Sequence, residues 1–140
     1  MCQNFEVQYL HCDRATPSTA RRFVAHQLGG ELPDGADSAI ETAVLVTSEL
    51  VTNAVRAGCQ HLELRLAVNR SGVRVAVEDD VDGVPRPRVA GIEDVRGRGL
   101  AIVGAVSRGW GTEPTAAGKS VWADIELPGE LRHTSPCTEP

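Results

Sequence analysis

Two neighbouring stretches of the sequence alternate regularly between apolar and polar residues, and this alternation limits the fold more than any other feature. They are HLELRLAV at residues 61–68 and GVRVAVED at residues 72–79. Successive side chains of a strand point to opposite faces of a sheet, so each stretch is predicted to be a strand with one buried face. The apolar positions are Leu62, Leu64, Leu66, Val73, Val75 and Val77. The link at residues 69–72, NRSG, is typical of a tight turn and predicts a hairpin.

A helical pattern stands on the N-terminal side of this hairpin. Thr16 followed by Pro17 is typical of a helix N-terminus, because threonine caps free N–H groups and proline fits the first helical position. We expect this helix to run to about Leu28 and to be stopped by Gly29 and Gly30.

A second, longer helical pattern runs from Ser38 to about Ala57. Ser38 and Glu41 have the spacing of a capping box, in which each side chain bonds a free backbone N–H at the start of the helix. Apolar residues recur along the segment as a broad stripe, so one face is predicted to be buried. Gly58 is predicted to end this helix.

Three further parts complete the pattern of elements. NFEVQYLH at 4–11 predicts an edge strand, and GRGLAIVGAVS at 97–107 predicts a glycine-rich turn that opens a short helix. RGWGTEP at 108–114 and KSVWADIEL at 119–127 predict a closing hairpin. The resulting order is β-α-α-β-β-α-β-β. It predicts an α+β fold, a two-layer α/β sandwich with helices on one face of a mixed, mostly antiparallel sheet.

Length and composition are those of one ordinary globular domain. The chain has 140 residues, of which 41% are hydrophobic and 24% charged. We expect a single domain over residues 1–127 and a flexible tail over residues 128–140. No apolar run is long enough to cross a bilayer and no signal peptide begins the chain, so we expect a cytoplasmic protein without membrane contact. The net charge of −5 argues against direct binding of nucleic acid, which usually needs a basic face.

The sequence contains four cysteines, at positions 2, 12, 59 and 137. They form no C-x-x-C pair, and their spacing supports no zinc site. Because disulfides are rare in a reducing cytosol, we expect free thiols.

The long helical segment carries two polar residues among its apolar ones. Glu49 and Asn53 stand four residues apart in SELVTNAV at 48–55, so their side chains are predicted to lie on one helix face, one turn apart. Taken by themselves, such residues are most often part of a solvated face. They are followed, however, by a strand-end aspartate, a glycine pair before a helix and a final Lys-Ser strand, and this order is far more specific than any one of its parts.

Asp79 stands at the end of the second alternating strand. It follows Val77 by two residues, so its side chain is predicted to point into the interior with the valines. A buried carboxylate is costly unless it accepts hydrogen bonds, which favours a binding role. The alternative is an aspartate that caps the turn, which is plausible because Asp80 and Asp82 share that turn.

Gly97 and Gly99 stand directly before the predicted short helix, which begins at about Leu100. Backbone N–H groups and the helix dipole at such a position attract phosphate. A single G-x-G is weak evidence, because most such pairs are only turns.

In this order, the motifs resemble the GHKL (Bergerat) ATP-binding fold of gyrases, heat-shock chaperones and histidine kinases. More closely, the sequence is similar to the small anti-sigma-factor serine/threonine kinases of bacterial partner switching, in their actinobacterial form. The resemblance covers roughly residues 16–127. SELVTNAV resembles the N-box of that family, VAVEDDVDG and GRGLAIV resemble its two glycine boxes, and GKSVWADIEL resembles its closing strand.

The resemblance implies a role for each motif residue. Glu49 would be the general base that takes a proton from a protein serine or threonine. Asn53 would coordinate Mg²⁺ together with the phosphates of ATP. Asp79 would accept a hydrogen bond from the adenine amino group. The other implied positions in ATP binding are Gly83 for approach to the base, Gly97, Arg98, Gly99 and Leu100 for the phosphates, and Ser120 near the adenine.

The implied function is an ATP-binding anti-sigma factor that phosphorylates an anti-sigma antagonist and sequesters a sigma factor, and the resemblance also allows a homodimer. The sequence departs from the family where Val81 replaces a glycine of the first glycine box and where Asp80 and Asp82 add negative charge. These departures leave open a non-catalytic, partner-binding regulator with a degenerate or regulatory nucleotide site. A third alternative is a structural α+β domain in which the glycine motifs are only turns.

Overall fold

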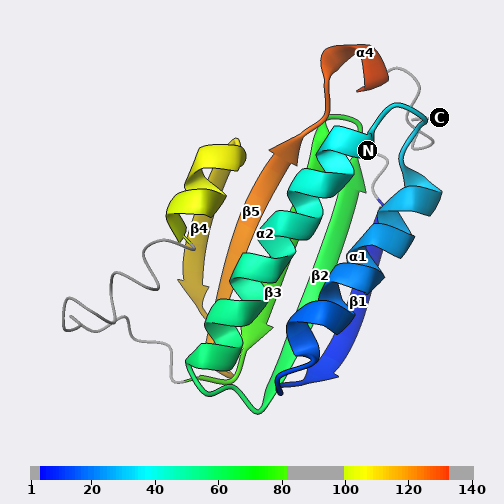
Figure 1. Cartoon of the computed structure of the whole chain (residues 1–140). Coiled ribbons are helices and arrows are strands. Elements are labelled where there is room, and N and C mark those ends of the chain that lie inside the picture. Colours follow the sequence, from blue (N-terminus) through cyan, green and yellow to red (C-terminus); the bar gives the residue numbers. More distant parts are fainter. Residues whose placement is uncertain (1–3, 82–99, 133–140) are drawn as a thin grey trace.

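The computed structural model describes residues 4–81 and 100–132, and Figure 1 shows them as a sheet with helices on one face. The strands are β1 (Asn4–His11), β2 (His61–Asn69), β3 (Gly72–Asp79), β4 (Gly109–Pro114) and β5 (Lys119–Glu126). The helices are α1 (Thr16–Glu31), α2 (Asp37–Arg56) and α4 (Gly129–Arg132), and residues 100–106 form a further short helix. None of the helices in these two ranges is long and apolar enough to cross a membrane. The predicted α+β class and the predicted order of elements are confirmed.

The strands lie in the order β1-β2-β3-β5-β4. Each pair of neighbours is antiparallel, so the expectation of a mixed sheet is wrong in that detail. The reason lies in the two helices between β1 and β2. Helix α1 leads the chain away from the end of β1, and α2 leads it back (Figure 1). Strand β2 therefore begins beside the end of β1, where His61 pairs with His11, and runs in the opposite direction.

The core lies between α2 and the central strands. Leu64 of β2 and Val75 of β3 are fully buried, α2 packs on β3 and β5, and α1 packs on α2. The alternation of both strands thus directs their apolar side chains towards the helices. Strand β1 is an edge strand, as predicted. Its Phe5 and Tyr9 are 54% and 74% exposed, because their register with β2 places them on the opposite face of the sheet.

Helix α1 begins and ends differently from the prediction. Thr16 belongs to the helix and does not cap it: its hydroxyl donates to the carbonyl oxygen of His11 and accepts the N–H of Asp13. At the other end the helix continues through the glycine pair at 29–30. Leu28 is fully buried there, so packing on the core holds the last turn together and outweighs the low helix propensity of glycine.

Helix α2 also begins without the predicted cap. No side chain bonds its free N–H groups, so the capping box of Ser38 and Glu41 does not form. The helix starts at Asp37, whose negative charge in the first turn suits the helix dipole. Gly58 ends the helix as predicted: its φ is +94°, and its N–H donates to the carbonyl oxygen of Val55 at 3.0 Å.

Four residues of the expected tail are helical. Residues Gly129–Arg132 form helix α4, and Leu131 packs against the core. The burial of this leucine explains a helix that the polar sequence of the tail did not predict. Residues 133–140 lie outside the described residues.

A disulfide bond joins Cys12, just after β1, to Cys59, just after α2. The two Cα atoms are 5.7 Å apart, within the ordinary range for such a bond. The expectation of free thiols is therefore wrong for this pair. A separation of 47 residues hides the relationship in the sequence, whereas the fold brings both elements to the same end of the sheet. Cys2 and Cys137 lie outside the described residues.

Candidate functional site

Glu49 and Asn53 lie together on one flank of α2, and both are half-buried. Helical geometry places this flank on the side away from α1, since Ser48 on the opposite flank accepts a hydrogen bond from Arg21 of α1. Across residues 4–81 and 100–132, neither the Glu49 carboxylate nor the Asn53 amide has a hydrogen-bond or ion-pair partner. The helix thus presents a carboxylate and an amide oxygen, one turn apart, with free acceptor positions.

The short helix of residues 100–106 lies on the same face of the sheet as α2, on the side of α2 away from α1 (Figure 1). Thr42, two turns before Glu49 on the same flank, lines a surface hollow together with Val106 of the short helix. Leu100 is half-buried and is the first described residue of this helix. The other predicted residues of the glycine boxes lie outside the described residues: Asp82, Gly83, Gly97, Arg98 and Gly99.

Asp79 ends β3 with a buried carboxylate. The residue is only 3% exposed and faces the helices, as its place in the alternation predicted. Its Oδ1 accepts a hydrogen bond from the N–H of Val81 at 3.0 Å, which is the bond expected if Asp79 caps the turn. Its Oδ2 accepts a hydrogen bond from the Lys119 ammonium at 2.9 Å. Each carboxylate oxygen has two lone pairs, so within the described part of the chain one acceptor position on each oxygen is left without a partner.

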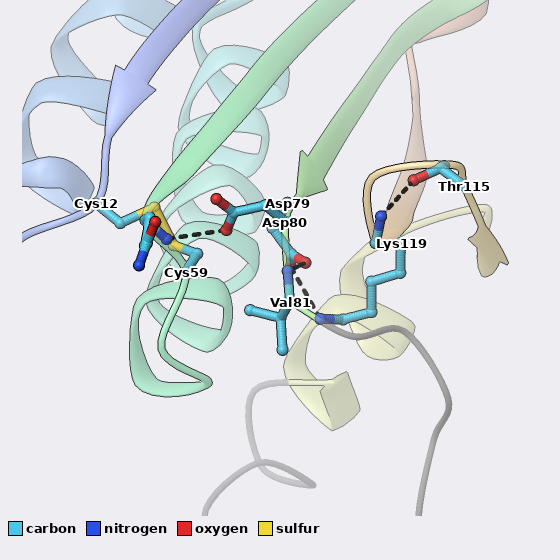
Figure 2. Close-up of polar contacts among 9 residues, drawn as sticks. Cys12, Cys59, Asp79, Asp80, Val81, Thr115 and Lys119 are labelled. Atoms are coloured by element: carbon cyan, nitrogen blue, oxygen red, sulfur yellow. Dashed lines mark hydrogen bonds and ion pairs between the residues drawn. A yellow bond between two sulfur atoms is a disulfide. The ribbon is translucent and has the colours of Figure 1, made fainter.

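Lys119, the first residue of β5, is the cation that reaches Asp79 (Figure 2). The register of β3 and β5 pairs Lys119 with Asp79 and pairs Ser120 with Glu78. Paired residues share a face of the sheet, so Ser120, expected near the adenine, lies on the face away from the helices. Sequence reasoning missed Lys119. Alternate residues of a strand share a face, so counting back in steps of two from the buried Ala123 places Lys119 on the buried face.

The second carboxylate at this strand end has a structural role. Asp80 accepts the backbone N–H groups of Gln60 and His61 at 2.9 and 3.0 Å. These bonds, the one from Gln60 foremost, hold the pKa of Asp80 below its ordinary value. Asp80 thereby fastens the end of β3 to the turn after α2, beside the disulfide of Cys59 (Figure 2).

These contacts bring separate parts of the chain to one end of the sheet. Helix α2 ends there with Asn53 in its last turn, and β3 ends where β5 begins, with Asp79 against Lys119. Carboxylate and amide oxygens on α2 are ligands that a hard divalent cation prefers. The paired Asp79 and Lys119 offer a hydrogen-bond acceptor beside a donor. A nucleotide that carries a metal ion needs hydrogen-bonding groups for its base and oxygen ligands for the ion, and this end of the sheet offers both.

Comparison with known families agrees with this geometry. The family model described as histidine kinase-like ATPase domain matches residues 13–124, a range that contains each described residue of the candidate site. No individual curated protein matches the sequence. The family match indicates an ATP-binding domain, and the two-layer α+β architecture is that of the GHKL fold. The chain therefore belongs to the histidine kinase-like ATPase domain family.

Proposed function

We propose that this protein is an ATP-dependent serine/threonine kinase that phosphorylates an anti-sigma antagonist and also sequesters a sigma factor. The observation that carries the proposal is the placement of Glu49 and Asn53. They lie half-buried on the flank of α2 away from α1, and α2 ends at the same end of the sheet as Asp79. If Glu49 and Asn53 belonged only to a solvated face of α2, the buried carboxylate of Asp79 at the same end of the sheet would serve no purpose connected with them.

In this proposal the base of ATP lies at the end of β3. The free acceptor position on the Asp79 carboxylate takes a hydrogen bond from the adenine amino group. Gly83 allows the backbone to approach the base. Gly97 and Gly99, which precede the short helix in the sequence, would donate backbone N–H groups to the phosphates, and Arg98 would add positive charge.

The transfer step is assigned to the flank of α2. Asn53 would supply a neutral oxygen for Mg²⁺, since its amide has no other partner in the described part of the chain. Bound Mg²⁺ supplies positive charge that offsets the charge of the phosphates. Glu49 takes the hydroxyl proton of a serine or threonine while that oxygen bonds the γ-phosphorus of ATP. The bond from this phosphorus to the oxygen of ADP breaks in the same step.

A phosphotransfer assay tests the proposal directly. The protein is incubated with Mg²⁺, γ-labelled ATP and the antagonist protein of the native cell, and the label is followed into serine or threonine of the antagonist. Transfer that depends on both proteins supports the kinase. Tight binding of Mg-ATP without transfer would rule out the kinase and leave the second candidate.

The second candidate is a non-catalytic regulator whose partner exchange alone carries the signal. It is favoured by Val81, which stands where the family has a glycine. Its N–H is bonded to Asp79 and its side chain packs against the core, so the strand end is fixed by its own contacts. In that case ATP changes the affinity for a sigma factor without any transfer. Pull-downs from native cell extract with and without ATP measure this change.

The proposal also covers location and assembly. A kinase of this kind works in the cytoplasm on protein partners, without contact to membrane or nucleic acid, and a homodimer is compatible with it. Size-exclusion chromatography with light scattering measures the oligomeric state.

A further inference from the structure

The ion pair between Asp79 and Lys119 is built into the sheet. The two residues are direct partners in the register of β3 and β5, so their side chains leave the same face at the same level. Lys119 Nζ lies 2.9 Å from Asp79 Oδ2, and the side chains of the lysine and the aspartate are 26% and 2% exposed. Lysine is seldom this well covered, and its position follows from strand pairing rather than from a flexible surface contact.

Counting only contacts among residues 4–81 and 100–132, both partners keep unused hydrogen-bonding positions. The Lys119 ammonium has three N–H donors, and one of them goes to Asp79. The Asp79 carboxylate accepts one bond from Lys119 and one from the N–H of Val81, which leaves one lone pair on each oxygen. The pair therefore presents a charged acceptor and a charged donor side by side, at the position proposed for the base.

We propose that Lys119 is a specificity-determining residue that reads the base together with Asp79. The inference rests on the proposed binding of ATP at this end of the sheet. The edge of adenine carries a donor, the 6-amino group, next to an acceptor, the ring nitrogen N1. Asp79 accepts from the amino group while Lys119 donates to N1. Guanine in the same pose presents a carbonyl oxygen to the carboxylate and an N–H to the ammonium, and both contacts are repulsive.

The charges of the site support this assignment. A carboxylate that is almost fully buried needs a compensating charge, and Lys119 supplies it before any ligand arrives. Adenine is neutral, so it adds to the ion pair without displacing either partner. If Lys119 served only as the counter-ion of Asp79, its remaining donors would have no role in binding.

Replacing N1 of the base by a C–H group tests the inference. Isothermal titration of the wild-type protein compares Mg-ATP with 1-deaza-ATP, which lacks the acceptor opposite Lys119 but keeps the 6-amino group for Asp79. A charged donor that loses its acceptor predicts roughly ten- to hundred-fold weaker binding of 1-deaza-ATP. Equal affinity for the two nucleotides would overturn the inference, and it would leave the proposed ATP site intact.

Variants of Lys119 complete the comparison. Lys119→Met keeps the unbranched stem of the side chain and removes the ammonium with its donors, so we expect weaker ATP binding and no difference between ATP and 1-deaza-ATP. Lys119→Arg keeps charge and donors, so we expect the difference to persist. A Lys119→Met protein that still discriminates between the nucleotides would contradict the inference. If Lys119→Met does not fold with Asp79 left unpaired, the wild-type titration decides alone. Absence of any ATP binding to the wild type would instead remove the proposed function and this inference with it.

Discussion

A Cβ atom on Gly118 would collide with the backbone carbonyl oxygen of Asp79, so only glycine fits where the β4–β5 turn crosses the end of β3. The same atom would lie 2.6 Å from the carbonyl oxygen of Val81. The hydroxyl oxygen of Thr115 accepts a hydrogen bond from the Gly118 N–H at 3.0 Å, and this bond closes the turn. Lys119 is the next residue in the chain, and the close crossing therefore fixes the distance at which it meets Asp79.

Gly118→Ala tests the importance of this crossing. The added methyl group meets backbone atoms that cannot move aside, so we expect a loss of stability of roughly 1–3 kcal/mol, together with weaker ATP binding. Gly29→Ala is the matched control: Gly29 lies in α1 with nothing within 4 Å of its added Cβ, and the change should raise stability by roughly 0.5–1 kcal/mol. Urea unfolding and ATP titration of both variants measure this. Wild-type behaviour of Gly118→Ala would show that the crossing is not restrictive.

The sheet could be predicted from the sequence because alternation reports burial directly. The residues of β2 and β3 that alternate as apolar are the ones that face the helices. The turn at 69–72 is held by its own hydrogen bonds, since Asn69 Oδ1 accepts two backbone N–H groups. The ends of α1 could not be predicted, because tertiary contacts override the local preferences. Thr16 bonds the end of β1, and burial of Leu28 carries the helix past two glycines.

The candidate site was predictable only in part for a similar reason. Asp79 was found because it continues the alternation of its own strand. The resemblance of motifs indicated Ser120 and gave Lys119 no role, and a difference of one residue along a strand changes the face of the sheet. The partners of Asp80 and of Cys12 lie far away in the sequence, so no local spacing indicates them.

The Cys12–Cys59 disulfide closes a loop that spans a sequence separation of 47 residues and ties the end of β1 to the end of α2. Closing such a loop restricts the unfolded chain, so reduction is expected to lower the free energy of unfolding by roughly 2–4 kcal/mol. Thermal unfolding with and without dithiothreitol measures the loss. The double variant Cys12→Ser, Cys59→Ser should show the same loss and no response to reductant. An unchanged melting temperature of the reduced wild type would contradict a stabilising bond.

Asp80 predicts a pH dependence of stability. The N–H groups of Gln60 and His61 hold its pKa below the ordinary value of 3.8, so the carboxylate stabilises the folded state above that pH. This stabilisation is lost as the pH falls through the lowered pKa of the folded state. We expect Asp80→Asn to be less stable than the wild type at pH 7, and the difference to shrink below the ordinary value. Urea unfolding of both proteins across acidic pH measures this difference in stability. A difference that does not change with pH would contradict a stabilising role for the ionised Asp80 carboxylate. ATP affinity should stay unchanged or rise slightly, because a negative charge is removed.

Replacing Asn53 is expected to weaken the binding of ATP only when Mg²⁺ is present. Asn53→Ala removes a neutral oxygen ligand, so the affinity for Mg-ATP should fall while the affinity for metal-free adenosine changes little. Calorimetric titrations with and without Mg²⁺ measure both. Thr42→Ala, on the same flank of α2 at the end away from Asp79, is the matched control and should leave both affinities unchanged. An equal loss for both ligands in Asn53→Ala would mean that the amide supports the fold rather than the ion.

Replacing Glu49 is expected to slow phosphoryl transfer without weakening the binding of ATP. Glu49→Gln keeps the size of the side chain and removes the base that takes the hydroxyl proton, so phosphorylation of the antagonist should slow by roughly 10²–10⁴-fold while ATP affinity is retained. Initial rates with labelled ATP, beside calorimetric affinities, separate the two effects. Glu41→Gln is the matched control: Glu41 lies in the same helix, exposed and two turns nearer its start, and its replacement should leave the rate unchanged. Since Glu49 is half-buried with no partner among the described residues, its replacement should not disturb the fold. Wild-type rates in Glu49→Gln would therefore remove this residue from the mechanism and favour a different base.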